Sequence, residues 1–151
     1  MHRLSSHAVR SQLDGIVHWP TQQADRGADL TAAAVYRLVA PGQLDFGGSE
    51  FAPADREAIN PKRAHPDDDY GWWRLDAGTY LIRYNESLVL DTGSTARLFP
   101  LDRLLQAGAH HPTMMMDEPH DPLETVITVG DAGCHLKENC RISRLIISGQ
   151  E

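Results

Sequence analysis

One short helical segment in a chain otherwise full of strand signals limits the fold more than any other feature. It opens the stretch from Phe99 to Val129, where three leucines near residues 101–107 recur at helical spacing: Leu101, Leu104 and Leu105. Pro100 suits a first helical position, and Gly108 suits a left-handed cap that ends the helix. A lone two-turn helix of this kind is uncommon among strands, so this stretch decides both fold and function.

Two strand-like runs follow the helix. Met114–Met116 and Thr125–Val129 are separated by a polar turn that contains Pro119 and Pro122. Apolar runs on both sides of a proline-bearing turn predict a hairpin directly after the helix. The methionine run is expected to serve as strand core, because methionine fills irregular apolar space.

The remaining segments predict an all-β barrel or sandwich. The clearest strand is Thr79–Glu86, in which Tyr80, Ile82 and Tyr84 share one face. A short helix is expected within residues 1–14, and residues 49–71 are expected to form a surface excursion. Further strands are predicted near residues 15–19, 34–39, 88–90, 96–99, 134–136 and 141–148, the last two as a closing pair.

Composition excludes several classes of protein. A length of 151 residues predicts a single domain over residues 1–151. The net charge of −7 argues against a nucleic-acid partner, because backbone binding needs a basic face. No apolar run reaches the length of a membrane span, and two cysteines are too few for a disulfide scaffold. A cytoplasmic location is therefore expected.

Five segments, taken in order, resemble the trimeric dUTPase and dCTP deaminase superfamily, most closely its short archaeal-type dUTPases. The matching segments are Gly27–Thr31, Gly42–Phe46, Trp72–Glu86, Leu104–Ala109 and Asn139–Ile147. The resemblance implies an all-β, β-clip barrel with one short internal helix. It also implies a homotrimer with nucleotide sites between subunits.

The helix start departs from the family's phosphate-binding motif. That motif is Pro-Arg-Ser-Ser-Leu, in which an arginine, hydroxyls and helix amides hold the phosphate chain. Here Leu101 takes the arginine position, Asp102 the first serine position and Arg103 the second. A carboxylate repels phosphate, and Asp102 is expected to cap the helix instead.

The base-reading turn departs as well. The family has an aspartate followed by a Gly-Tyr pair and a further glycine. Asp117 keeps the aspartate, but Pro119 and Pro122 replace the glycines and His120 replaces the tyrosine. Proline fixes φ and removes an N–H donor, so a glycine turn cannot persist there. The catalytic glutamate of the deaminase branch would fall at Ile127, which argues against deamination.

The resemblance places the candidate site residues. Asp117 would activate water as a general base, and the candidates for substrate binding are Asp29, Arg103, Gln106, Arg141 and Arg144. Simpler alternatives stay open. Asp117 also suits an ordinary turn, and Asp29 also suits a capping or turn position.

No metal site is predicted. The spacing Cys134-His135-x4-Cys140 matches no common zinc pattern. No cofactor is expected, except Mg²⁺ if the chain hydrolyses dUTP. Trp72 and Trp73 are expected to pack in and around the core rather than to stack on a base.

Three functions stay open. The first, favoured by the loss of two site motifs, is a dUTPase-like homotrimer without catalysis. It would act as a structural or binding module, for example within a larger protein assembly that decorates a viral capsid, which would place it in a virion. The second is an active dUTP diphosphatase that converts dUTP to dUMP and pyrophosphate. The third is a nucleotide-binding regulator.

Overall fold

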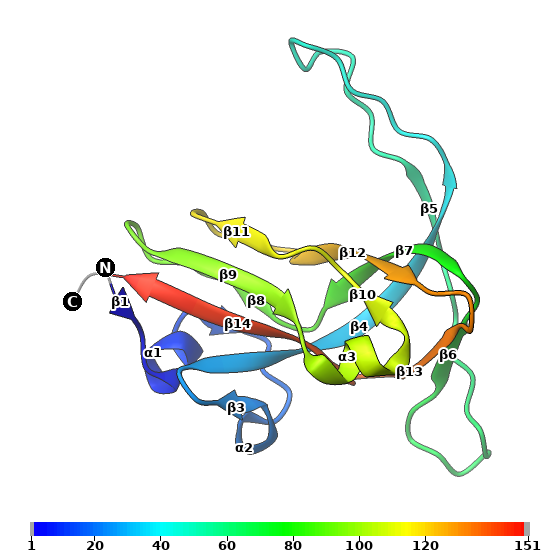
Figure 1. Ribbon diagram of the computed structural model, residues 1–151, viewed down its shortest axis with the longest axis horizontal. Coiled ribbons are helices and arrows are strands. Elements are labelled where there is room, and N and C mark those ends of the chain that lie inside the picture. The colour runs from blue at the N-terminus through cyan, green and yellow to red at the C-terminus, as the bar shows by residue number, and fades with distance from the viewer. Residues whose placement is uncertain (1, 150–151) are drawn as a thin grey trace.

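The computed structural model describes residues 2–149, which are mostly short antiparallel strands (Figure 1). The helices of this part are α1 Ser6–Arg10, α2 Trp19–Gln22 and α3 Asp102–Ala107, and none is long and apolar enough to cross a membrane. The strands are β1 His2–Arg3, β2 Leu13–Asp14, β3 Gln23–Ala24, β4 Gly27–Ala40, β5 Asp55–Ala58, β6 Trp72–Leu75, β7 Gly78–Tyr84, β8 Ser87–Leu88, β9 Thr95–Pro100, β10 Ala109–His110, β11 Met114–Met116, β12 Glu124–Val129, β13 Cys134–Lys137 and β14 Arg141–Gly149.

Ten of the described strands form one curled antiparallel sheet. Its main path runs β10-β12-β7-β4-β14-β9-β11, and β1, β3 and β5 pair at its margins. β4 is central because its 14 residues are enough to pair with β14 near its start and with β7 farther along. Two smaller pairs, β13 with β6 and β2 with β8, complete the fold.

The core follows from strand alternation. On β7, Tyr80, Ile82 and Tyr84 are buried and the residues between them are partly exposed, as the pattern in Thr79–Glu86 predicts. β12 and β14 alternate in the same way. The largest fully buried aliphatic side chains are Leu30, Ile82, Leu88, Leu98, Leu123, Ile127, Ile142, Leu145 and Ile147. The all-β prediction is confirmed.

The predicted helix is present, but its edges differ from the prediction. α3 ends at Gly108, which adopts the left-handed conformation with φ of 104°. Pro100 ends β9, opposite Ser143, and does not open the helix. The helix starts after Leu101, and Leu105 is half exposed because so short a helix buries only a narrow face.

The hairpin predicted after the helix does not form. β11 pairs with β9, whereas β12 pairs with β7 and β10, so the two runs join different parts of the sheet. Pro119 and Pro122 lack the N–H groups that a tight ladder needs. His120, which lies between them, exchanges two backbone hydrogen bonds of 2.9 Å with Leu88 instead. Both strands predicted at the end of the chain are present, and β13 pairs with β6 while β14 pairs with β4, β9 and β1.

The strand predicted at residues 15–19 is wrong as well. This segment is a loop that leads into α2, and Pro20 sits in the first turn, where a missing N–H is tolerated. The side chain of Gln22 accepts hydrogen bonds from the N–H groups of Val17 at 2.9 Å and His18 at 2.8 Å. These N–H groups are therefore satisfied without a partner strand.

Residues 49–71, predicted as one surface excursion, divide into two parts. β5 pairs with the outer end of β4, and residues 36–58 form a hairpin, here called the arm, that stands away from the barrel (Figure 1). Residues 59–71 form a separate loop. It is closed where Lys62 and Trp72 exchange backbone hydrogen bonds of 2.8 and 3.0 Å. The excursion is mostly exposed, as predicted, and it contains the short strand β5.

A chain of buried hydrogen bonds joins two strands, β7 and β14, to the loop after β10. The Nδ1–H of His111 donates to the carbonyl of Pro112 at 2.9 Å, because that oxygen can only accept. His111 Nε2 therefore accepts from the hydroxyl of Ser143 at 2.7 Å, and Tyr84 donates to Ser143 at 2.6 Å. Burial lowers the pKa of His111 and raises the pKa of Tyr84. All three side chains are thus held neutral.

This arrangement predicts that the fold loses stability in mild acid. Because the pKa of His111 is lower in the folded chain than its ordinary 6.5, the unfolded chain binds more protons as pH falls below 6.5. Stability then decreases with falling pH, by at most about 1.4 kcal/mol per pH unit from this group. Urea unfolding at pH 5, 6, 7 and 8 would measure it. His111→Asn should flatten the dependence of stability on pH, and His110→Ala, at an exposed neighbouring residue, should not. Equal pH profiles for the wild type and His111→Asn would show that His111 is not the group responsible.

Candidate functional site

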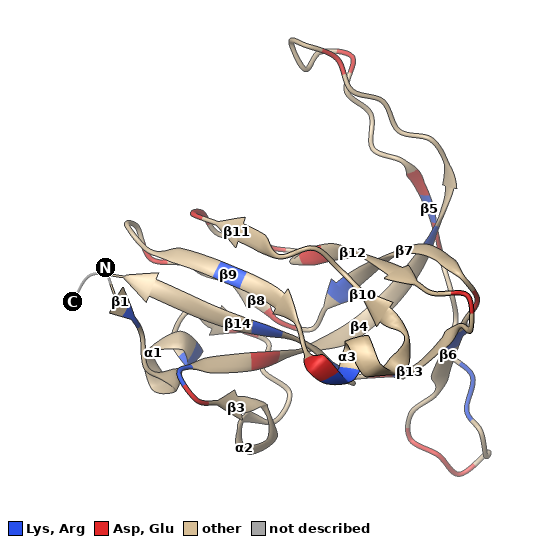
Figure 2. Ribbon diagram, in the orientation of Figure 1, with Lys and Arg blue, Asp and Glu red and all other residues tan. Residues whose placement is uncertain are grey.

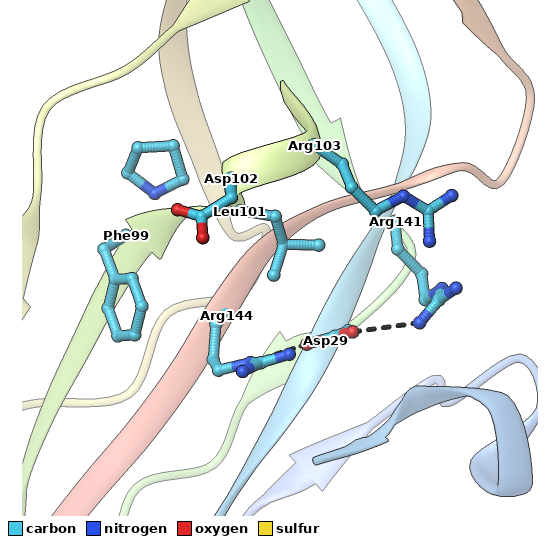
Figure 3. A pocket seen from close by; sticks show the side chains of 8 residues that line it. Asp29, Phe99, Leu101, Asp102, Arg103, Arg141 and Arg144 are labelled. Atoms are coloured by element: carbon cyan, nitrogen blue, oxygen red, sulfur yellow. Dashed lines mark hydrogen bonds and ion pairs between the residues drawn. The ribbon is translucent and has the colours of Figure 1, made fainter. Parts of the chain in front are cut away.

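Four segments meet at a cleft of about 290 Å³ beside the start of α3 (Figure 3). The register of β14 brings them together, because Arg144 lies opposite Asp29 of β4 on one side and opposite Phe99 of β9 on the other. α3 follows β9 directly, so its first turn reaches the same place. The lining consists of Asp29, the segment Phe99–Arg103, Arg141 and Arg144.

Asp29 is the buried carboxylate around which two arginines of this cleft are arranged. It is only 3% exposed, and its two oxygens are taken by two arginines. Arg144 Nε donates to Oδ1 at 2.9 Å, and Arg141 Nη1 donates to Oδ2 at 3.1 Å (Figure 3). Charge-assisted bonds of this kind fix both partners in place. The alternative of Asp29 as a capping or turn residue is therefore wrong, since it lies within β4 and anchors two cations.

The first turn of α3 carries charges of both signs. Leu101 is the N-cap and forms no side-chain cap, while Asp102 lies in the first turn, so the expectation that Asp102 caps the helix is wrong. In Figure 3 the carboxylate of Asp102 lies on the Phe99 side of the cleft and Arg103 on the Arg141 side. Among residues 2–149, Arg103 makes no ion pair. Arg103 is therefore the cation of the cleft that has no ion-pair partner within the described chain.

A buried carboxylate that sequence reasoning missed supports the strand below the cleft. Glu86 is 1% exposed and accepts hydrogen bonds from the N–H of Thr31 at 2.9 Å, the hydroxyl of Thr31 at 2.7 Å and Nε2 of Gln22 at 2.7 Å. The same Gln22 nitrogen donates to the carbonyl of Asp29 at 2.9 Å. These residues, here called the Glu86 hub, join α2, β4 and the turn after β7.

Burial dominates the chemistry of this hub. It raises the pKa of Glu86, and the hydrogen bonds from Thr31 and Gln22 oppose that rise only in part. Every donor to the carboxylate is neutral. The sequence offers one signal, a polar Asn85-Glu86 pair at the end of the clearest strand, and the alternation there predicts that both residues belong to the strand.

The structure brings together four of the six predicted site residues. Asp29, Arg103, Arg141 and Arg144 line one cleft. Gln106 is exposed on α3 and does not line it. Asp117 is exposed just beyond Met116, which pairs with Ala96 at the other end of β9 from Phe99. Within one chain, the candidate general base and the arginines are therefore separate.

The histidines and cysteines do not form a cluster. Among residues 2–149, no group of three or more histidine, cysteine or acidic side chains is placed to hold a metal ion. Cys134 and Cys140 are free thiols, and burial raises the pKa of Cys140 to about 11. Thiols with raised pKa values are poor nucleophiles, so neither cysteine is a candidate for catalysis.

Trp72 and Trp73 have packing roles, as the sequence predicts. Trp73 is buried in the core, and its indole N–H donates to the carbonyl of Ile59 at 2.8 Å. Trp72 is partly exposed and lies 5.4 Å beneath the ammonium group of Lys137. Ile127, the position that corresponds to the deaminase glutamate, is fully buried in the core.

Comparison with known proteins identifies the group to which this architecture belongs. No family model matches the chain. Proteins named as probable deoxyuridine 5′-triphosphate nucleotidohydrolases are similar to it: that of Methanosarcina acetivorans is 29% identical over 136 residues, which cover 89% of this chain and 76% of the relative. That of Archaeoglobus fulgidus is 29% identical over 128 residues, covering 83% and 71%.

A solved structure agrees at the level of the fold. The 2′-deoxycytidine 5′-triphosphate deaminase of Agrobacterium tumefaciens superposes with a TM-score of 0.70 at 15% identity, over 98% of this chain. The present chain spans about half of that protein, 48% of its length. The sequence relatives and the shared fold agree with the five matched segments: this chain is similar in sequence to probable archaeal dUTPases and shares its fold with a dCTP deaminase.

Proposed function

We propose that this chain is a dUTPase-like homotrimer that has lost catalysis and serves as a structural or binding module. The observation that carries the proposal is the composition of the cleft at the start of α3. Asp102 brings a carboxylate to the place where the family motif binds phosphate, and Leu101 replaces the arginine of that motif. Arg141 and Arg144 are already paired with Asp29. Among the residues that line the cleft, Arg103 is the arginine without an ion pair.

The segment after β11 supports the same proposal. Asp117 would need a nucleotide base held close to it by backbone donors. Pro119 and Pro122 supply no N–H, and the N–H of His120 is bonded to Leu88. Losing one positioned donor where charge develops costs about 2.7–4 kcal/mol. The loss of several is more than one remaining carboxylate can offset.

An active dUTP diphosphatase is the second candidate, favoured by the names of the relatives and by the uncommitted Arg103. In that case Asp117 of one subunit would activate water at the cleft of another. Mg²⁺ in such sites takes one or two carboxylates together with substrate phosphates. Asp29 is bound by two arginines, so Asp102 is the carboxylate of the cleft that could contact the ion. A regulator that binds nucleotide without turnover would use the same residues.

The chain is expected to form a trimer in solution. Met115 is 65% exposed on β11, and Val126 on β12 also projects outward. Exposed apolar side chains on strands mark surfaces that associate. Light scattering coupled to size exclusion should give three times the 16.8 kDa of one chain. Met115→Ser should lower that mass, and Thr92→Ala, at an exposed turn, should not. A monomer at micromolar concentration would refute the trimer.

Catalysis is expected to be absent or very slow. With dUTP and magnesium, turnover should lie far below the common enzyme range of about 1–10³ per second. The measurement is pyrophosphate release, with calorimetry for dUTP, dUMP and dCTP on the same sample. The double variant Leu101→Arg/Asp102→Ser should gain affinity for dUTP, because it restores two positions of the phosphate motif. Leu105→Arg, which adds the same charge on the exposed side of α3, is the matched control. Turnover within the common range in the wild type would overturn the proposal.

A further inference from the structure

The tip of the arm presents large apolar side chains with nothing covering them. Phe46 is 109% exposed and Leu44 is 87% exposed relative to the free residue, and Phe51 is more than half exposed. The arm stands away from the barrel, so no part of its own chain packs on them (Figure 1). Contiguous exposed apolar side chains are uncommon on a monomer and mark an interaction surface.

The tip is nevertheless ordered by its own hydrogen bonds. Gln43 and Ala52 exchange backbone bonds of 2.8 and 3.1 Å, so the two strands of the arm stay paired up to the tip. The carboxylate of Asp45 accepts from the N–H groups of Gly48 and Glu50, both at 3.1 Å. A surface that is already ordered loses little conformational entropy on binding. The tip is therefore suited to insert into a rigid site.

The cleft beside α3 has the complementary properties. Its walls include Phe99 and Leu101, and its three arginines outnumber its two aspartates, Asp29 and Asp102, by one charge. The exposed guanidinium of Arg103 can both stack on an aromatic ring and pair with a carboxylate. The outer part of the arm, residues 38–55, carries three acidic residues and no basic one, Asp45, Glu50 and Asp55, whereas its base adds Arg37, Arg56 and Glu57. Figure 2 shows basic positions at α3 and β14, among other elements, and acidic positions at the tip of the arm.

The tip cannot reach the cleft of its own chain. Asp29 lies near the start of β4 and the arm leaves from its end at Ala40. Eleven residues of extended strand separate them by about 36 Å, and the paired strands of the arm point away from the barrel (Figure 1). Only the cleft of another copy is within reach.

We infer that the tip of the arm, Leu44–Phe51, docks into the cleft lined by Leu101 and Arg103 of a second copy of this chain. Phe46 enters between Phe99 and Arg103, and Glu50 faces Arg103. The contact is heterologous, tip to cleft, so it closes when the copies form a ring. The inference rests on the self-association in the proposed function, and it adds that the partner's arm occupies the cleft where the family binds phosphate.

Cysteine cross-linking between two differently sized chains tests the contact directly. Phe46→Cys is placed in one chain and Arg103→Cys in a chain with a fusion tag, and the two are mixed and oxidised. Both positions are exposed, so folding is not at risk. A disulfide-linked product of mixed size is expected. Thr92→Cys in place of Phe46→Cys is the control, because it lies at an exposed turn away from the arm and should give little product.

A charge exchange tests the pairing without cysteine. Phe46→Ser should weaken self-association by about 10- to 100-fold in sedimentation, since a Phe side chain returns to water. Glu50→Arg should also weaken it, and Arg103→Glu in the same chain should restore part of the loss. A trimer by light scattering with no mixed cross-link and no effect of Phe46→Ser would refute the docking and leave the trimer standing. If light scattering and sedimentation both show a monomer, the trimer and the docking of the arm are both refuted.

Discussion

Replacing Trp73 with alanine is expected to lower the free energy of unfolding by about 4 kcal/mol. The side chain is almost fully buried on β6 and is the largest residue of the core. Alanine leaves a cavity that rigid strands cannot close, and it leaves the carbonyl of Ile59 without its 2.8 Å indole donor. Because Ile59 begins the loop of residues 59–71, this loop should lose order together with the core. Urea unfolding at pH 7 measures the energy, and hydrogen exchange measures the loop.

Trp72→Ala is the matched control for this prediction. The two rings are adjacent in sequence, but Trp72 faces solvent and contacts the ammonium group of Lys137 at 5.4 Å. Losing such a contact costs about 1 kcal/mol. If the two alanine variants lost similar stability, Trp73 would not be the core residue that its burial indicates. If Trp72→Ala instead abolished nucleotide affinity, the base-stacking alternative would return.

The parts of the fold that sequence predicted are those set by local rules. The alternation in Thr79–Glu86 and the left-handed Gly108 depend on neighbouring residues alone, and both are as predicted. Which strand pairs with which is a nonlocal property. The sequence predicts a hairpin of Met114–Met116 and Thr125–Val129 because the two runs are close in sequence. In the structure the first run pairs with β9 and the second with β7.

The candidate site also combines features that the sequence predicts with features that depend on how the strands pair. The family resemblance identified Asp29, Arg141 and Arg144 as site residues, but their mutual pairing follows from the register of β14 against β4. The Glu86 hub was missed because Gln22 and Glu86 are 64 residues apart in sequence. No spacing rule joins them. A buried glutamate with only neutral donors is visible only once the strands are in place.

Glu86→Ala is expected to lower the free energy of unfolding by about 3 kcal/mol. Alanine leaves the N–H and hydroxyl of Thr31 and one Gln22 proton buried without an acceptor. Relief from burying a charge offsets part of this cost, since the raised pKa shows that burial opposes ionisation. The Thr31 amide, bonded directly to the carboxylate, should exchange with solvent faster than in the wild type. Gln22 should also release the carbonyl of Asp29, which loosens the floor of the cleft.

Glu86→Gln separates the charge from the hydrogen bonds. It keeps the shape and one acceptor, so its loss should be smaller than that of alanine, while Glu118→Ala, at an exposed loop position, should have almost no effect. In the folded chain the pKa of Glu86 is raised above its ordinary 4.5, so above that pH the folded chain binds more protons than the unfolded chain. The contribution of Glu86 to wild-type stability therefore falls as the pH rises. The deficit of Glu86→Gln relative to wild type should therefore shrink from pH 5 to pH 8. A deficit that grows over that range would mean that Glu86 is stabilised as a carboxylate, contrary to its burial among neutral donors.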